Sequence, residues 1–207
     1  MFSWLKDKTE GGPAGSVDAL LADGIALAGG DEREAALECF RRAAAKAPAR
    51  VDVWLLQGEL LSSLARLDDA VEALRQATRH CPQEMRGWLD LGRALLALDR
   101  PAEAVAALEQ AWALVEEDLE TALSLGAAYR REGRTDQALA MFERAAAAAP
   151  ADAPACYELA STLLAGGRAP EAREEFARYL EIAPADSPQR AAAERVVRLL
   201  ATRAGTD

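Results

Sequence analysis

The residue types that most often carry acid–base, nucleophilic or metal chemistry are scarce in this sequence. His80 is the only histidine, and the three cysteines, Cys39, Cys81 and Cys156, lie far apart. A general base needs a nucleophile or an orienting partner within hydrogen-bond reach, and a zinc site needs Cys and His at short spacings. The sequence shows neither arrangement. We therefore interpret His80 as a cation favoured near a helix end and Cys156 as a core residue.

Other motifs of catalysis are also missing from the sequence. No Gly-rich phosphate loop follows a strand pattern, and acidic pairs such as Glu116-Glu117 and Glu174-Glu175 are typical of solvated helix faces and helix ends. We expect a protein that is not an enzyme and that holds neither a cofactor nor a metal ion.

Composition narrows the class of partner and the compartment. The net charge of -10 argues against nucleic acid, because phosphate binding needs a basic face. No apolar run reaches the roughly 18 residues of a membrane span, and the stretch from Phe2 to Leu5 is too short for a secretory signal. An odd number of separated cysteines is typical of a reducing compartment. We expect a cytoplasmic protein, and its Ala-rich and Arg-rich composition suggests a bacterium.

A repeat organises the chain. One series of small residues recurs every 34 residues, at Gly24, Gly58, Gly92, Gly126 and then Ala160. Twelve positions after each member stands Ala36, Ala70, Ala104, Ala138 or Ala172, and four positions later Phe40, Leu74, Leu108, Phe142 or Phe176. Apolar residues within each unit recur at three-residue and four-residue steps, which predicts helices and not strands. Small residues at the eighth position let two antiparallel helices approach closely.

Prolines mark where these helices begin and end. Pro101 and Pro170 fall in first helical turns, and Pro48, Pro82, Pro150 and Pro184 stand where the second helix of a unit should stop. The third unit lacks such a stop and carries Glu116-Glu117-Asp118 instead. We expect its second helix to run longer than the others.

The pattern closely resembles the tetratricopeptide repeat. The residues that carry the resemblance include Trp54, Gly58, Ala70 and Pro82 in one unit, Trp88, Gly92, Ala104 and Leu108 in the next, and Leu125, Gly126, Tyr129, Ala138, Phe142 and Pro150 in a third. The resemblance implies an all-α, right-handed superhelix of helix-turn-helix units. The units are residues 17–50, 51–84, 85–118, 119–152 and 153–186.

Both ends of the array have their own pattern. Residues 187–207 are expected to form a capping helix and tail, because Glu194 stands where the small packing residue of a further unit would be. Residues 1–16 form a flexible tail and linker, and Ser16 is expected to cap the first helix. Phe2, Trp4 and Leu5 form either an anchor for another surface, with at most weak membrane contact, or a cap on the first unit.

The resemblance also implies an inner groove lined by the first helix of each unit. The fifth positions are Leu21, Leu55, Leu89, Leu123 and Tyr157, which predicts an apolar row. Further candidates are Ile25, Glu59, Arg86, Arg93, Leu96 and Arg130. The alternative is that some of these leucines are covered by neighbouring helices and only stabilise the array. Because solenoids of this kind hold a peptide or helix in such a groove, we expect an apolar or amphipathic protein segment as the ligand.

One version of this groove can be tested by position. Family members that hold the acidic tail of heat-shock chaperones use Lys, Asn and Arg at five places that here hold Leu21, Ile25, Leu56, Arg86 and Asp90. Only Arg86 fits, so this carboxylate clamp is not predicted. Two functions stay open. The first is a scaffold or adaptor that assembles a complex with an unidentified partner, and the second is a structural protein that forms homo-oligomers.

Overall fold

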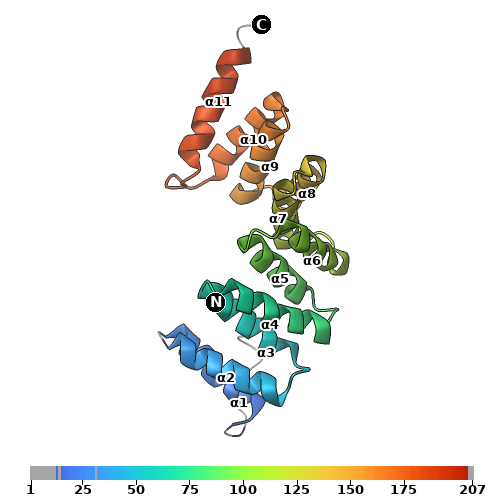
Figure 1. Cartoon of the computed structure of the whole chain (residues 1–207). Helices are drawn as coiled ribbons and strands as arrows, with labels where there is room; N and C mark the ends of the chain where they lie inside the picture. The colour runs from blue at the N-terminus through green and yellow to red at the C-terminus, as the bar shows by residue number, and fades with distance from the viewer. Residues whose placement is uncertain (1–12, 14, 31, 205–207) are drawn as a thin grey trace. The chain divides into compact units, whose positions relative to one another are not determined.

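A computed structural model describes residue 13, residues 15–30 and residues 32–204, and it divides the chain into two compact units, Met1–Val115 and Glu116–Asp207. Its described residues form helices and no strands, which confirms the predicted all-α fold (Figure 1). In the first unit the helices are α1 (Val17–Gly29), α2 (Arg33–Lys46), α3 (Val51–Ser63), α4 (Leu67–His80), α5 (Met85–Ala97) and α6 (Pro101–Leu114). In the second unit they are α7 (Leu119–Arg131), α8 (Thr135–Ala148), α9 (Ala153–Ala165), α10 (Ala169–Ile182) and α11 (Arg190–Ala204).

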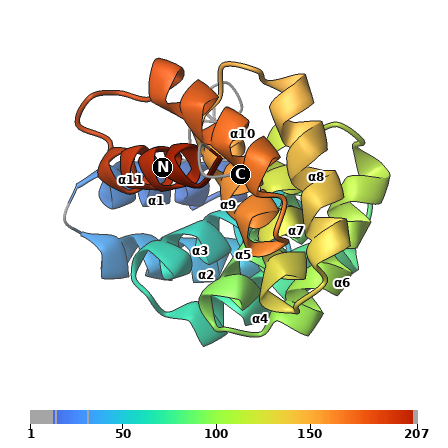
Figure 2. The same cartoon turned by 90° about the horizontal axis from the view of Figure 1, so that it is seen from above.

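The helices form five pairs followed by one further helix. The first helix of each pair has 13 residues and the second has 14. Each first helix packs against its own second helix, and α11 packs against α10, to which it is joined by an irregular loop (Figure 2). Helix-turn-helix repeats of this kind are the predicted architecture, with α11 in the place of the predicted cap.

Close packing inside each pair explains the small residue at the eighth position. A Cβ atom added to Gly58 would lie 2.6 Å from Cγ of Leu74, and one added to Gly126 would lie 2.7 Å from Cε1 of Phe142. Distances this short are essentially never seen between a Cβ atom and a nonbonded heavy atom. The Leu or Phe from the second helix thus fills the space that a larger residue would need.

The predicted helix starts and stops are found with one exception. The Oγ atom of Ser16 accepts a hydrogen bond from the backbone N–H of Ala19 at 3.2 Å, so Ser16 caps α1. Helices α2, α4, α8 and α10 all end two residues before a proline. The expectation of a longer second helix in the third unit was wrong, because α6 ends at Leu114 after the usual 14 residues. Asp118 caps α7 there, and Glu117 adopts a positive φ of 69°.

The tryptophan at the fourth position of a repeat links that repeat to the one before it. The indole Nε1–H of Trp54 donates to the carbonyl oxygen of Pro48 at 2.8 Å, and Trp88 donates to Pro82 at 2.9 Å. Each hydrogen bond joins the first helix of a repeat to the proline near the end of the preceding repeat. Cys156 holds the equivalent place in α9 and is fully buried, as predicted. Burial raises the pKa of its thiol.

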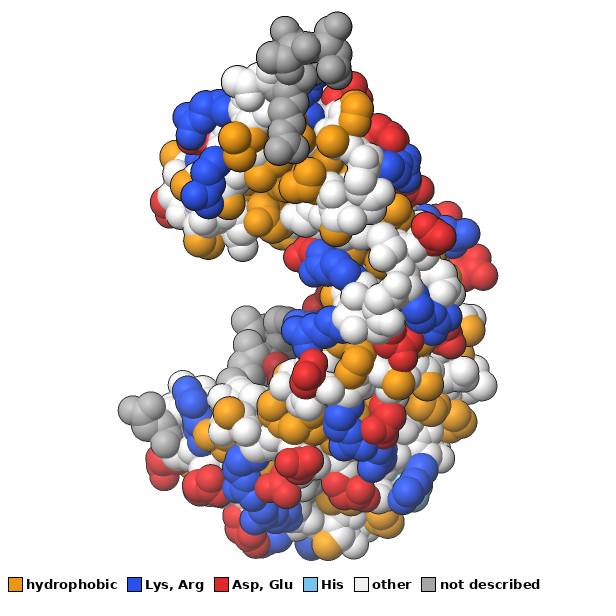
Figure 3. Space-filling model, turned by 45° about the horizontal axis from the view of Figure 1, so that its top comes forward, with side chains coloured by type: hydrophobic (Ala, Val, Ile, Leu, Met, Phe, Trp, Pro, Cys, Tyr) orange, Lys and Arg blue, Asp and Glu red, His pale blue; other side chains and the backbone are white. Residues whose placement is uncertain are grey.

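Each compact unit has its own core. In the first unit Leu21, Leu37, Phe40 and Leu56 are fully buried in one cluster. In the second, Phe176 and Tyr179 from α10 pack with Ala193 of α11. On the face of the first unit seen in the lower part of Figure 3, acidic and basic side chains are interspersed. Among the helices that the structure describes, none is long and apolar enough to cross a membrane.

Candidate functional site

The predicted apolar row does not form in the first unit. Leu21, Leu55 and Leu89 stand at the fifth positions of α1, α3 and α5, and their side chains are at most 2% exposed. For Leu55 the reason is that α3 packs directly on α5: its Cδ2 atom lies 3.8 Å from the place of a Cβ on Gly87. These three leucines are core residues, so the prediction that they line an accessible groove was wrong.

In the second unit the same positions are more open. Leu123 in α7 and Tyr157 in α9 are both half-buried. Tyr157 packs edge-on against Phe176, with 5.7 Å between ring centroids, and lies 5.2 Å from the ring of Tyr179. Part of its ring is therefore fixed by the core while the rest reaches the surface.

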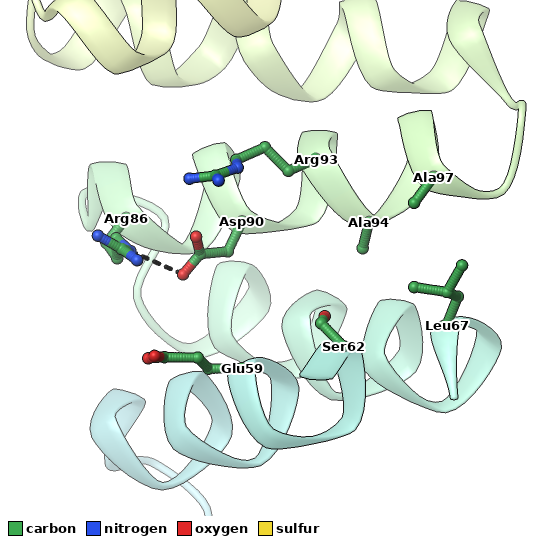
Figure 4. Close-up of a pocket in the computed structure, with 8 residues that line it drawn as sticks. All are labelled: Glu59, Ser62, Leu67, Arg86, Asp90, Arg93, Ala94 and Ala97. Carbon is green, nitrogen blue, oxygen red and sulfur yellow. Dashed lines mark hydrogen bonds and ion pairs between the residues drawn. The ribbon is translucent and has the colours of Figure 1, made fainter. Parts of the chain in front are cut away.

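A polar pocket in the first unit collects several of the predicted groove residues. It has a volume of about 310 Å³ and lies between α3, the start of α4, and α5 (Figure 4). Its lining consists of Glu59, Ser62, Leu67, Arg86, Asp90, Arg93, Ala94 and Ala97. Three of these, Glu59, Arg86 and Arg93, were predicted from repeat position. The structure therefore brings together charged groups from two successive first helices, and we call this the α3–α5 pocket.

An ion pair forms one wall of the α3–α5 pocket. The Nε–H of Arg86 donates to Oδ2 of Asp90 at 2.8 Å, one helical turn along α5. The Asp90 side chain is only 14% exposed. This burial raises the pKa of Asp90, although the hydrogen bond from Arg86 acts in the opposite direction. Arg93, one turn further along α5, is exposed.

Asp90 lines the α3–α5 pocket but was not among the groove residues predicted from repeat position. It stands at the sixth position, where the comparison with a carboxylate clamp counted it only as a residue of the wrong charge. The available signal was its place four residues after Arg86, a spacing at which opposite charges meet on one helix face. Considering which residues share a face of this helix would have predicted the ion pair between Arg86 and Asp90.

Three other predicted residues lie outside the α3–α5 pocket. Ile25 is partly buried and packs against the core of the first unit. Leu96 is half-buried on α5. Arg130, in the second unit, forms an ion pair with Glu158 and lies with its guanidinium carbon 5.5 Å from the centre of the Phe142 ring. Arg130 is thus already neutralised within its own unit.

A second pocket lies in the second unit, where α9 begins and the loop leads from α10 to α11. It has a volume of about 400 Å³ and is lined by Ala153, Pro154, Tyr157, Glu158, Tyr179, Pro184, Asp186, Ser187, Pro188 and Gln189. The hydroxyl groups of Tyr179 and Ser187 are 2.5 Å apart and join α10 to the loop. Of the predicted groove residues only Tyr157 lines this pocket, which we call the α9-loop pocket.

The remaining candidates concern the N-terminal tail and metal binding. Phe2, Trp4 and Leu5 lie outside the described residues, so their role as anchor or cap stays a prediction. Within the part of the chain that the structure describes, no group of three or more His, Cys, Asp or Glu side chains could hold a metal ion.

Comparison with known sequences and structures gives a consistent result. A family model described as Cytochrome c-type biogenesis protein H TPR domain matches residues 73–190, and a second, described as Tetratricopeptide repeat, matches residues 51–94. No curated protein sequence matches the chain.

Several solved structures share the fold. MamA from Desulfovibrio magneticus RS-1 is 18% identical with a TM-score of 0.76, covering 83% of this chain and 97% of its own. YrrB, described as a TPR protein with an unusual peptide-binding site, is 20% identical with a TM-score of 0.72, covering 99% and 96%. PilW, described as a type IV pilus biogenesis factor, is 23% identical with a TM-score of 0.71, covering 92% and 93%. At these identities the likeness establishes the fold.

Proposed function

Because more than half of this chain matches the Cytochrome c-type biogenesis protein H TPR domain, it belongs to that family of tetratricopeptide repeats, and we propose that it is a non-catalytic adaptor that binds a segment of a partner protein in the α3–α5 pocket. Domains of this repeat class typically serve as protein-interaction scaffolds. The peptide-binding site named for YrrB supports the same kind of ligand here.

The observation that carries this proposal is the meeting of charged side chains from two repeats in one pocket. Glu59 and Ser62 come from α3, whereas Arg86, Asp90 and Arg93 come from α5. Position along a single helix does not require this convergence, which depends on the stacking of α3 against α5. A ligand segment lying across both helices would meet all of these groups together.

The charges of the α3–α5 pocket define the ligand more narrowly than its position does. Arg86 is paired with the carboxylate of Asp90, and Arg93 is exposed where it lines the same pocket. We therefore expect an acidic residue of the ligand to contact Arg93. The small side chains of Ala94 and Ala97 and the side chain of Leu67 add an apolar border, which fits an amphipathic segment.

A peptide selection experiment tests the proposal. A random peptide library is selected against the wild-type chain, and the affinities of the selected peptides are measured for Arg93→Glu and for Arg79→Glu. Arg79 is an exposed residue of α4 that does not line the pocket, so it is a control for the change in net charge. We expect peptides with an acidic residue beside apolar ones, and at least a tenfold loss for Arg93→Glu, about 1.4 kcal/mol. Peptides that bind Arg93→Glu as well as wild type would contradict the proposal.

We further propose a cytoplasmic location, supported by three free cysteines placed on separate elements. The absence of catalysis is supported by the surroundings of His80, whose ring stacks on Trp54 with 6.4 Å between centroids. Self-association stays a prediction, which light scattering over a range of protein concentrations checks.

A further inference from the structure

At the seventh position, where three repeats have a core leucine, the first repeat has the exposed Asp23 and the second repeat has the partly buried Gln57. The seventh positions of the third, fourth and fifth repeats hold Leu91, Leu125 and Leu159, which are 5%, 2% and 5% exposed. The seventh position of the second repeat is Gln57, in α3. A residue that breaks a local rule of its own fold without an evident structural gain marks a candidate functional position.

Gln57 also leaves a buried polar atom unsatisfied. Its Oε1 atom is buried and accepts no hydrogen bond from the described residues. A buried acceptor without a partner costs free energy comparable to a lost hydrogen bond, and most such atoms in folded proteins are paired. A leucine at this position would carry no such cost, so the fold alone does not explain the glutamine.

The side chain of Gln57 borders a cavity of about 340 Å³ between α2, α3 and α4. We call it the α2–α4 pocket; its lining is Arg41, Trp54, Gln57, Leu61, Asp69, Glu72, Ala73 and Gln76. Gln57 and Glu59 are two residues apart on α3, which places them about 200° apart around the helix axis. The α2–α4 pocket is therefore on the opposite side of α3 from the α3–α5 pocket.

Carboxylates outnumber guanidinium groups in the lining of the α2–α4 pocket. Asp69 and Glu72 supply two carboxylates, against one guanidinium from Arg41. Asp69 already binds Arg66 at 2.7 Å, and Glu72 accepts a hydrogen bond from Gln76 at 2.8 Å. Carboxylates have further lone pairs to offer, so both can accept additional hydrogen bonds.

The corresponding place in the next repeat is arranged differently. There Arg75 of α4 and Glu103 of α6 form an ion pair at 3.0 Å between the two second helices. The equivalent residues one repeat earlier are Arg41 and Asp69, and Asp69 is instead bound by Arg66, three residues before it. The seventh position of that next repeat is the buried Leu91. Gln57 and the two carboxylates thus occur together in the α2–α4 pocket, whereas the next repeat has Leu91 and the single carboxylate of Glu103 at the equivalent positions.

We propose that the α2–α4 pocket binds a cationic side chain, arginine or lysine, presented by a partner protein. The buried amide oxygen of Gln57 accepts a hydrogen bond from the N–H groups of that side chain, and Glu72 supplies the opposite charge. Trp54 borders the same cavity and is held by its bond to Pro48, so an aromatic surface is available for the stem of the cation. This site is distinct from the α3–α5 pocket and lies beyond the proposed function.

The test uses single blocked amino acids as probes for the side chain. N-acetyl-arginine methylamide, the lysine equivalent and the uncharged citrulline equivalent are titrated into the full chain. The signals followed by NMR are the side-chain amide of Gln57 and the indole N–H of Trp54. We expect both signals to shift saturably with arginine or lysine at concentrations up to about 50 mM, the range for a single weak contact, and not with citrulline.

Matched variants separate binding from folding. Gln57→Leu installs the residue that the repeat itself uses, so it should leave the thermal unfolding midpoint unchanged or raised, while affinity for the cation, followed on Trp54, falls at least fivefold. Gln110→Leu changes the equivalent of Gln76 in the next repeat and should leave affinity unchanged. The proposal is overturned if neither cation gives a saturable shift, if citrulline binds equally well, or if Gln57→Leu retains full affinity.

Discussion

The α3–α5 pocket and the α9-loop pocket use the same repeat positions to make different surfaces. At the second and sixth positions the first has Arg86 and Asp90, joined as an ion pair, whereas the second has Pro154 and Glu158. At the fifth position Leu89 is buried and Tyr157 is half-exposed. The repeat therefore sets where a side chain is placed, while its neighbours decide whether a ligand can reach it.

The packing of neighbouring helices contributes to this difference. In the first unit α3 packs directly on α5, and this contact covers Leu55 at the fifth position of α3. In the second unit α9 is followed by α11, which packs chiefly on α10. The loop of residues 183–189 then borders Tyr157 in place of a closely packed helix. A capping helix thus changes the exposure of residues in the unit that it covers.

The largest expected effect comes from placing a charge at the two fifth positions. Leu89→Asp puts an unpaired carboxylate in the core and should lower the free energy of unfolding by at least about 3 kcal/mol. Tyr157→Asp, at a half-exposed site, should lower it by about 1 to 2 kcal/mol. Urea unfolding followed by circular dichroism measures both. Equal losses of unfolding free energy in the two variants would contradict the difference in burial between the two fifth positions.

A smaller effect is expected at the eighth position, where α3 has Gly58 and α9 has Ala160. Gly58→Ala introduces a Cβ only 2.6 Å from Leu74 and should cost about 1 to 3 kcal/mol through overpacking. Ala160→Gly in α9 should cost about 1 kcal/mol through helix propensity alone. Thermal and urea unfolding compare them. A stabilised Gly58→Ala protein would show that the helices can separate slightly without penalty.

The smallest expected effect is a pH dependence confined to the α3–α5 pocket. The pKa of Asp90 is raised in the folded chain above its ordinary value of 3.8, so as pH rises from there the unfolded chain loses this proton first. Asp90 therefore makes the folded state less stable as pH rises through that window. The stability of wild type minus that of Asp90→Asn should fall over the window, and urea unfolding at several pH values measures it. Asp186→Asn, in the exposed loop, is the control and should show no such fall attributable to burial.

The sequence predicted the fold well because the determining contacts repeat. Gly58 and Leu74 meet across one helix pair in the same way as Gly126 and Phe142, so a single spacing predicts each of them. The prediction of the site was less complete. Repeat position located Glu59, Arg86 and Arg93, but it did not show that α5 covers Leu55. Burial between successive first helices depends on how closely they stack, which a one-dimensional pattern does not contain.

The tryptophans that join successive units have a further consequence for spectroscopy. All four tryptophans of the chain fall within residues 1–115, and all three tyrosines fall within residues 116–207. The indoles of Trp54 and Trp88 are each fixed by a proline carbonyl. Intrinsic tryptophan fluorescence, excited where tyrosine does not absorb, therefore reports on the first unit. Its melting can be followed in the unlabelled chain and compared with that of the whole chain by circular dichroism.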